Sequence, residues 1–231
     1  MQLVPPTERR DDSSSVGRVG TRLQNIQYPP ITRTAGHDED SRIMPSGSPS
    51  APRLTVEQLE ERLAEGDRWI ELVDGHLIRL NPPDEIHGDV VRNLSHPLAK
   101  LVKSLPDLCV CFELPIVISR EQATVRCPAI SCFQSANRFE ETEKLLTDTR
   151  PALVIEVAST NDRREGMSDR VSSYLDAGVI GVWVIDPVTR HVHQFISGRG
   201  GTMLKENDVL NGAPLLPGLQ QIGRASCRER V

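Results

Sequence analysis

The chain has 231 residues, of which 38% are hydrophobic and 26% are charged, so it can form one core of moderate size with tails. Its 32 acidic residues outnumber its 27 basic ones, and the formal charge of −5 excludes a globally basic surface for nucleic acid. Neither a membrane-spanning apolar run nor a signal-peptide pattern is present, so we expect a cytoplasmic protein with no membrane partner. Whether the protein forms a homodimer is left open.

The two ends of the chain differ in composition from its middle. Residues 1–52 are rich in Ser, Pro, Gly, Arg and Asp and have no hydrophobic periodicity, which predicts a disordered segment. Residues 53–221 are predicted to form the folded domain. Residues 222–231 resemble the in-frame translation of a sequencing adapter, and we interpret them as an artefact.

The first predicted elements are a helix and a hairpin. Apolar residues at helical spacing predict a short helix over residues 56–66, and Thr55 with Gln58 forms a capping-box pattern at its start. The stretch 69–80 predicts two short strands that turn at Asp74-Gly75.

The next part of the chain alternates helical and strand patterns. Residues 90–101 predict a helix that Pro97 should kink or split. The runs 108–118 and 124–133 each predict a long strand, and the polar residues between them suit a hairpin loop. A short helix is expected over residues 141–146.

An apolar run at residues 153–157 predicts a central strand that is covered on both faces. This strand carries Glu156. An ionised carboxylate in such a strand costs several kcal/mol unless it is paired, so we interpret Glu156 as a site residue. No glycine-rich phosphate loop follows, which argues against a nucleotide-cofactor domain.

The segment after this strand predicts a crossover unit. Apolar residues at helical spacing mark a helix that Asn161 or Asp162 caps and Gly178 ends, and the run 182–185 then returns as a second apolar strand. The two strands are expected to be parallel. With a further strand at 191–196, the sequence predicts an α/β fold: a mixed β-sheet flanked by helices, with a βαβ crossover.

Five cysteines occur, at positions 109, 111, 127, 132 and 227. Free thiols are the expected state in a chain without an export signal. Zinc binding is the alternative, although the spacing from Cys127 to Cys132 is not that of a zinc knuckle.

Several motifs in a fixed order resemble the Uma family of proposed restriction endonucleases. The likeness covers roughly residues 54–219 and implies the restriction-endonuclease-like core of the PD-(D/E)XK nucleases. The segments that carry it are Glu71, Arg126-Cys-Pro128-Ala129-Ile, Leu153-Val-Ile-Glu156-Val, Asp169-Arg170-Val-Ser-Ser-Tyr174 and Trp183-Val-Ile-Asp186-Pro187.

The resemblance implies a metal-dependent site with two changes. The family pattern supplies an aspartate, a glutamate and a lysine, and two carboxylates with a nearby ammonium suit Mg²⁺-assisted phosphodiester hydrolysis. Here Ala129 stands at the aspartate position and Arg170 at the lysine position. Glu156 is implied as a catalytic metal ligand, Mg²⁺ as the cofactor if the site is active, and Glu71 or Glu113 as a substitute carboxylate.

Other interpretations of these candidate site residues are left open. Glu156 and Arg170 can instead form a structural ion pair. Arg163, Arg164 and Arg170 line the start of the crossover helix and can meet a DNA backbone, or they can belong to a solvated helix face that Asp162, Glu165 and Asp169 balance. His87 matches a histidine of the family but is interpreted as a surface or capping residue.

Two functions follow from these observations. The first is a metal-dependent DNA endonuclease with an incomplete active site. The alternative is a catalytically degenerate nuclease-fold domain that binds nucleic acid or protein. The two differ in whether a defined carboxylate cluster binds magnesium or manganese.

Overall fold

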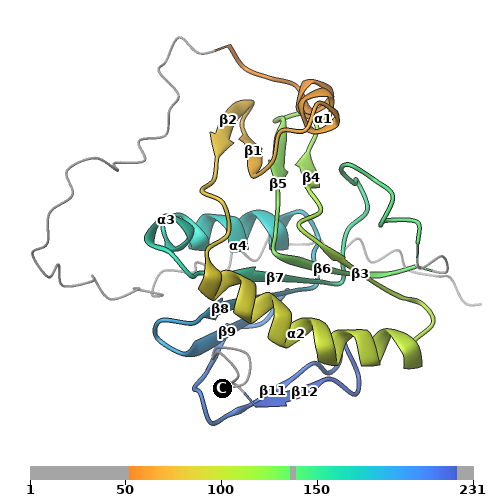
Figure 1. Ribbon diagram of the computed structural model, residues 1–231, viewed down its shortest axis with the longest axis vertical. Helices are drawn as coiled ribbons and strands as arrows, with labels where there is room; N and C mark the ends of the chain where they lie inside the picture. Colours follow the sequence, from red (N-terminus) through yellow and green to blue (C-terminus); the bar gives the residue numbers. More distant parts are fainter. Residues whose placement is uncertain (1–51, 136–138, 223–231) are drawn as a thin grey trace, which may run out of the picture.

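The computed structural model describes residues 52–135 and 139–222 (Figure 1). The predictions for residues 1–51 and 223–231 lie outside the described residues. Figure 1 shows a four-stranded sheet standing over a larger sheet, with helices against the larger one. Within the described ranges, none of the helices combines the length and the apolar character needed to cross a membrane.

The larger sheet has six strands in the order β10-β9-β8-β7-β6-β3. Only β7 and β8 among its strand pairs run parallel, and α4 (Met167–Asp176) lies between them in the chain, so the predicted βαβ crossover is confirmed. The strands are β3 (Leu108–Phe112), β6 (Ile130–Gln134), β7 (Leu153–Val157), β8 (Gly181–Asp186), β9 (His191–Ile196) and β10 (Thr202–Leu204).

The smaller sheet has the order β2-β1-β5-β4 and is antiparallel throughout. It contains β1 (Ile70–Val73), β2 (His76–Arg79), β4 (Ile116–Ser119) and β5 (Thr124–Arg126). The helix α1 (Val56–Ala64) packs on it through Val56, Leu59 and Leu63, and both hydrogen bonds of the predicted capping box are present. A separate pair, β11 (Val209–Asn211) and β12 (Gln220–Ile222), completes the strands.

Two helices cover opposite faces of the six-stranded sheet. On one face, α2 (Glu85–Ser104) packs its buried leucines against Ile155 and Trp183. On the other face, α4 packs Val171 and Tyr174 against β7 and β8. All five residues of β7 are buried, as expected for a central strand whose alternate side chains face two helices.

The two long predicted strands are each divided between the two sheets. In the first run, Glu113 has φ 50 and Pro115 follows, so the chain leaves β3 and re-enters as β4. In the second run, Cys127 and Pro128 separate β5 from β6. The prediction of two continuous strands was therefore wrong, because alternating apolar residues are equally compatible with two short strands in different sheets.

Pro97, which was predicted to kink or split its helix, does not split α2, which stays helical from residue 85 to 104 because buried leucines anchor it on both sides of the proline. Two other predictions about helices need correction. Residues 141–146 form turns rather than a helix. The crossover helix is preceded by a separate short helix, α3 (Asn161–Arg164), and begins after Gly166 in the left-handed conformation, φ 69.

The central position of β7 makes a prediction about stability. Val154 is fully buried against α4, and Val154→Asp places an unpaired charge there at a cost of several kcal/mol, against a total stability of ~5–15 kcal/mol. We expect the variant to be unfolded in circular dichroism and thermal melting. Val209→Asp, at a position that is 53% exposed, is the matched control and should melt like the unmodified protein. A cooperative melt of Val154→Asp would contradict the assignment of β7 as central.

Candidate active site

Two buried carboxylates from different sheets meet where the four-stranded sheet rests on the six-stranded one. Glu71 lies in β1 and is fully buried, and Glu156 lies in β7 and is 2% exposed. Strand alternation turns Glu156 to the face that α4 covers, because Ile155 and Val157 belong to the core on the α2 side. Arg170 and Tyr174, one helical turn apart in α4, reach it from that side.

The Arg170 guanidinium bridges the two carboxylates. Its Nε and Nη2 donate to Glu156 Oε1 at 3.2 and 2.7 Å, and its Nη1 donates to Glu71 Oε2 at 2.6 Å. Arg170 is 8% exposed, so both ion pairs lie in a low-dielectric environment. The ion pair between Glu156 and Arg170 that the sequence left open is therefore present, and Glu71 is added to it.

Three further donors complete this ionic cluster. Arg126 Nη1 donates to Glu71 Oε2 at 3.2 Å, and the backbone N–H of Cys127 donates to Glu71 Oε1 at 2.7 Å. The hydroxyl of Tyr174 donates to Glu156 Oε1 at 2.7 Å. Two guanidiniums thus face two carboxylates, and the cluster is formally neutral.

The environment shifts the pKa values of Glu71, Arg170 and Tyr174. Burial alone would raise the pKa of Glu71, but Arg170 and Arg126 outweigh it and lower the pKa below the ordinary value. Burial opposes the charge of Arg170, yet Glu156 and Glu71 hold the Arg170 pKa well above its usual range. Burial, with the charge of Glu156, raises the pKa of Tyr174 well above its usual range, so the phenol stays a hydrogen-bond donor.

A cavity of about 170 Å³ opens beside the cluster. Glu71, Glu156 and Arg170 form part of its wall, and Arg79 and Arg163 contribute further positive charge. It lies between the end of β2, the end of β7 and the start of α4, so it is the route by which a ligand would reach the two carboxylates.

Comparison with known proteins places this chain in a family. A model of the Uma2 family, described as "Putative restriction endonuclease", matches residues 55–226. This chain belongs to the Uma2 family. No curated protein matches the sequence. Among solved structures, it is similar to a protein from Anabaena variabilis titled "a putative nuclease belonging to DUF820", with 15% identity and a TM-score of 0.63 over 75% of this chain and 97% of that one.

The structural likeness confirms the predicted restriction-endonuclease-like fold of this Uma2 member. Ala129, which the resemblance in sequence sets at the aspartate position of the family, is 4% exposed and brings only a methyl group. Extending the antiparallel register of β6 and β7 by one residue sets Ala129 opposite Glu156. Glu71 from the other sheet, rather than a residue of β6, is the carboxylate that shares Arg170 with Glu156.

The carboxylate oxygens of this Uma2 site do not fit a magnesium ion as long as Arg170 is bonded to them. Mg²⁺ requires hard oxygen ligands in octahedral geometry. Glu71 Oε1, Glu71 Oε2 and Glu156 Oε1 already accept N–H or O–H donors, and the guanidinium carries the balancing positive charge. Among residues 52–135 and 139–222, no group of three or more His, Cys, Asp or Glu side chains is placed to hold a metal ion.

The other candidate residues of the sequence lie apart from the cluster. Glu113 is exposed in the turn between β3 and β4 and lines a different cavity. Arg164 makes a bidentate ion pair with Asp186, at 3.2 and 2.8 Å. This pair occupies much of the Arg164 guanidinium, so little of it is left to contact a phosphate. Arg163 Nη2 donates to the carbonyl of Asn81 at 3.0 Å and stays at the wall of the 170 Å³ cavity.

Sequence reasoning assigned no role to Arg126 or Tyr174. Arg126 ends the short strand β5, Thr-Val-Arg, which has a single apolar residue, so the criterion that selected Glu156 in an apolar strand does not single it out. Tyr174 follows Arg170 by one helical turn, and this spacing indicated that the two side chains lie on the same face of the helix.

His87 was predicted to be a surface or capping residue, and this was wrong. It is 3% exposed, and the helix cap is Asp84, whose carboxylate accepts the backbone N–H of His87 at 2.7 Å. Neither ring nitrogen has a hydrogen-bond partner within the described ranges. Burial, aided by the charge of Arg163, lowers the pKa of His87 to about 4, so the ring is neutral at pH 7.

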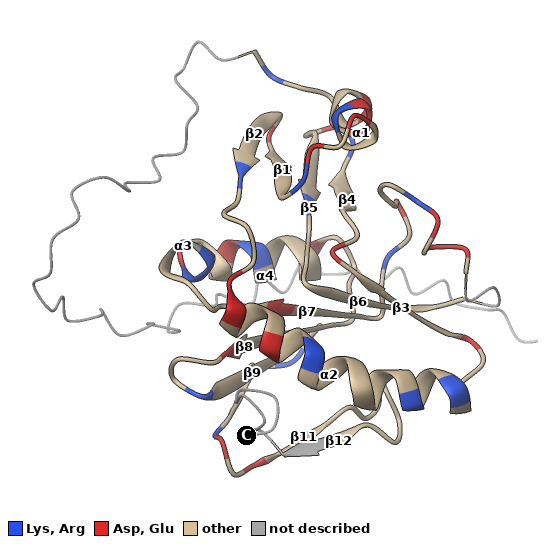
Figure 2. Ribbon diagram, in the orientation of Figure 1, with Lys and Arg blue, Asp and Glu red and all other residues tan. Residues whose placement is uncertain are grey.

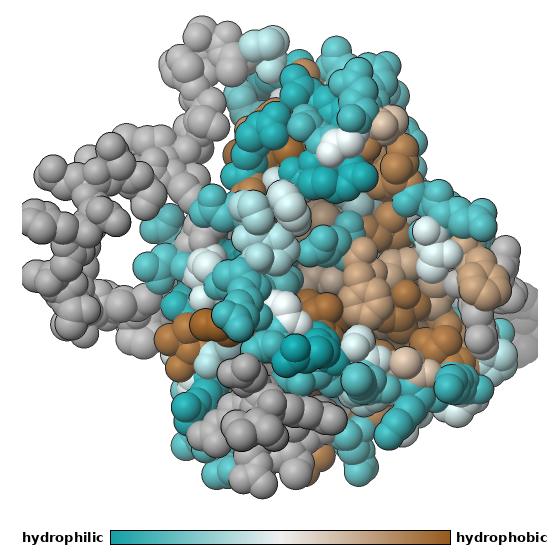
Figure 3. Space-filling model, in the orientation of Figure 1, coloured by the Kyte–Doolittle hydropathy of each residue, from teal (hydrophilic) through white to brown (hydrophobic). Residues whose placement is uncertain are grey.

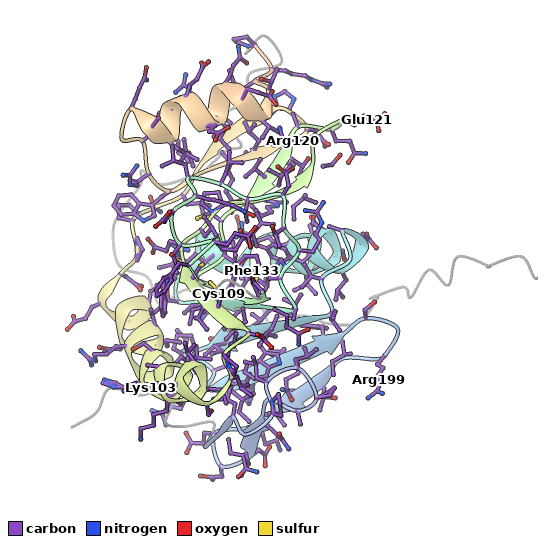
Figure 4. All side chains as sticks on the ribbon, turned by 90° about the vertical axis from the view of Figure 1, so that its right-hand side faces the viewer. Lys103, Cys109, Arg120, Glu121, Phe133 and Arg199 are labelled. Carbon is purple, nitrogen blue, oxygen red and sulfur yellow. The ribbon has the colours of Figure 1, made fainter. Side chains whose placement is uncertain are left out.

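The described cysteines are all free thiols. Cys109 and Cys111 lie side by side on β3, with their sulfurs 3.8 Å apart, and Cys109 packs with Phe133 in the interior of the fold (Figure 4). Burial raises the pKa of Cys111 and of Cys132 to about 12, so these thiols stay protonated at pH 7. Cys227 lies outside the described residues.

The lowered pKa of Glu71 makes a prediction about acid stability. The folded state favours the ionised form of the Glu71 carboxylate. The contribution of Glu71 to the free energy of unfolding is therefore fully present above its ordinary pKa of 4.5 and is lost as the pH falls through its lower pKa in the folded state. We expect Glu71→Gln to lower the free energy of unfolding at pH 7 by about 3–5 kcal/mol, since two guanidiniums lose a partner, and to reduce the fall in stability below pH 4.5.

Denaturant unfolding across the acid range measures both effects. Glu165→Gln removes an exposed carboxylate beside the same cavity and is the matched control. Equal stability of Glu71→Gln and Glu165→Gln at pH 7 would contradict the buried cluster.

Proposed function

We propose that this protein is a nuclease-fold domain that binds DNA and cleaves it weakly or not at all. The observation that carries the proposal is the Arg170 guanidinium, bonded to both Glu71 and Glu156. Membership of the Uma2 family supports DNA as the ligand. The changes at residues 129 and 170 reduce the expected activity.

The expected loss of activity follows from the chemistry of the side chains. Metal-assisted hydrolysis needs carboxylate oxygens that are open to the ion, and a bound Mg²⁺ would supply charge stabilisation and an activated water. Arg170 neutralises those oxygens, stays protonated, and cannot act as a base. Loss of a single charge-stabilising group costs ~10²–10³ in rate, and two positions have changed here.

DNA binding would depend on local charge. Figure 2 shows acidic and basic segments interleaved over this view, with acidic residues at the start of α2 and basic residues towards its end. Arg163 and Arg79, which is paired with Asp67 at 3.3 Å, are further basic groups in the wall of the 170 Å³ cavity. Few phosphate contacts predict moderate affinity with a modest salt dependence.

A metal-dependent endonuclease of low activity is the second candidate. The family match favours it, and it requires Arg170 to leave at least one carboxylate so that Glu156 and Glu71 can bind Mg²⁺. The two candidates differ in one property, which is whether the unmodified protein cleaves DNA in a metal-dependent way.

Plasmid nicking with magnesium or manganese separates the candidates. We expect the unmodified protein to show little or no nicking. The double variant Ala129→Asp with Arg170→Lys restores two carboxylates and an ammonium, and it should gain metal-dependent nicking that Glu156→Ala abolishes.

Each variant is compared with a chelator control and is first shown to melt cooperatively. Robust nicking by the unmodified protein that the chelator stops and that Glu156→Ala removes would contradict the proposal and favour the second candidate.

A further inference from the structure

A second cavity lies next to the ionic cluster and has a different character. It measures about 380 Å³ and lies between the start of β1, the turn from β3 to β4, and the turns around residues 141–145. Figure 3 shows apolar atoms gathered around the position of β3 on this face. The wall includes Trp69, Ile70, Phe112, Glu113, Cys127 and Leu145.

Two aromatic side chains of this wall are open to solvent. Trp69 is 36% exposed and Phe112 is 46% exposed. Exposed aromatic rings in a concave site are what a flat ligand needs, because a ring can stack on them with little loss of side-chain freedom. The aromatic content of the whole chain is 3%, so two exposed rings in one cavity are a local concentration.

The backbone of the wall is strained at two points. Trp69 has φ 52 and Glu113 has φ 50, a conformation that side chains with a Cβ adopt at an energetic cost. The other positive-φ residues besides glycine in the described ranges are Asp74, Ala123 and Arg190, and each lies in a tight turn between paired strands. Glu113 takes this conformation where the chain passes from β3 to β4, whereas Trp69 directly precedes β1 and lies in no such turn. Both residues line this cavity.

Cys127 connects the cavity to the ionic cluster. Its thiol donates to the carbonyl of Glu113 at 3.3 Å, and its backbone N–H donates to Glu71 Oε1 at 2.7 Å. Ile70, also in the wall, directly precedes Glu71. The cavity and the cluster are therefore linked through the backbone, with Ile70 and Glu71 on opposite faces of β1.

We propose that this cavity takes one unstacked nucleobase of a bound single strand of nucleic acid. The inference rests on the proposed function, and it deepens that function by naming how the strand is held. A cavity of about 380 Å³ lies at the small end of ligand sites, which suits a base rather than a folded partner. Trp69 and Phe112 supply stacking faces.

The polar groups of the wall suit the edges of such a ligand. Arg68 and Lys144 line the same cavity. Lys144 is paired with Glu141 of the same wall at 2.8 Å, so Arg68 is the cation that can meet a phosphate. The carboxylate of Glu113 is exposed and can accept an amino group of a base. Stacking tolerates every base, so the site should hold nucleic acid with little sequence preference.

Binding of fluorescein-labelled oligothymidylate to the full chain tests the proposal. Anisotropy at low salt gives the dissociation constant for the unmodified protein, for Trp69→Ala and for Phe112→Ala. Base stacking on an aromatic side chain predicts a loss of affinity of roughly 5- to 150-fold for each variant. Phe139→Ala is the matched control, because Phe139 is an aromatic residue, 64% exposed, that does not line the cavity.

An abasic strand of the same length supplies the second arm. The proposal expects the unmodified protein to bind it as weakly as Trp69→Ala binds oligothymidylate. It also expects oligothymidylate to quench the emission of Trp69, while Trp183, which is 2% exposed, supplies the unquenched background.

The failure of this proposal and that of the proposed function give different results. If the unmodified protein binds oligothymidylate but Trp69→Ala and Phe112→Ala match Phe139→Ala, or if the abasic strand binds equally well, the base site is wrong and DNA binding stands. If the unmodified protein binds neither single-stranded nor double-stranded DNA, both proposals are wrong.

Discussion

The bridge from Glu71 through Arg170 to Glu156 joins the two sheets of this protein. Glu71 belongs to the four-stranded sheet and Glu156 to the six-stranded one, so the guanidinium between them is a buried link across the layer boundary. Removing one partner of a buried pair costs ~3–5 kcal/mol because the other charge is left unpaired. That is a large share of the ~5–15 kcal/mol that keeps a domain folded. The surface pair of Arg120 with Asp148 has a far smaller effect.

The bridge also decides what chemistry the site can perform. Two buried carboxylates need a compensating cation, and either a divalent metal or a guanidinium satisfies that electrostatic requirement. Only the metal polarises water and a phosphodiester. Arg170 is carried by α4 and donates to both carboxylates through Nε, Nη1 and Nη2, so it meets the electrostatic requirement without a metal. Under the proposed function, the nuclease fold is kept while the metal-dependent activity is weak or lost.

The sequence predicted the central part of the fold because its signals there are local. The apolar run of β7, the helical spacing of α4 and the return strand β8 each follow from periodicity within one segment. Glu156 stood out because a charge in such a strand needs a partner. That Glu71 shares this partner could not be read from the sequence, since the two residues are 85 positions apart and lie in different sheets. The break between β3 and β4 depends on the left-handed conformation of Glu113, which no residue preference signals.

Thermal melting with and without millimolar manganese tests most directly whether Arg170 takes the place of a metal. An ion that binds only the folded state raises the melting temperature. The account predicts no shift for the unmodified protein and a clear rise for Arg170→Ala, whose two carboxylates are left open to the ion. Glu156→Ala combined with Arg170→Ala should lose that rise. A manganese-dependent rise in the unmodified protein that Glu156→Ala removes would contradict the account.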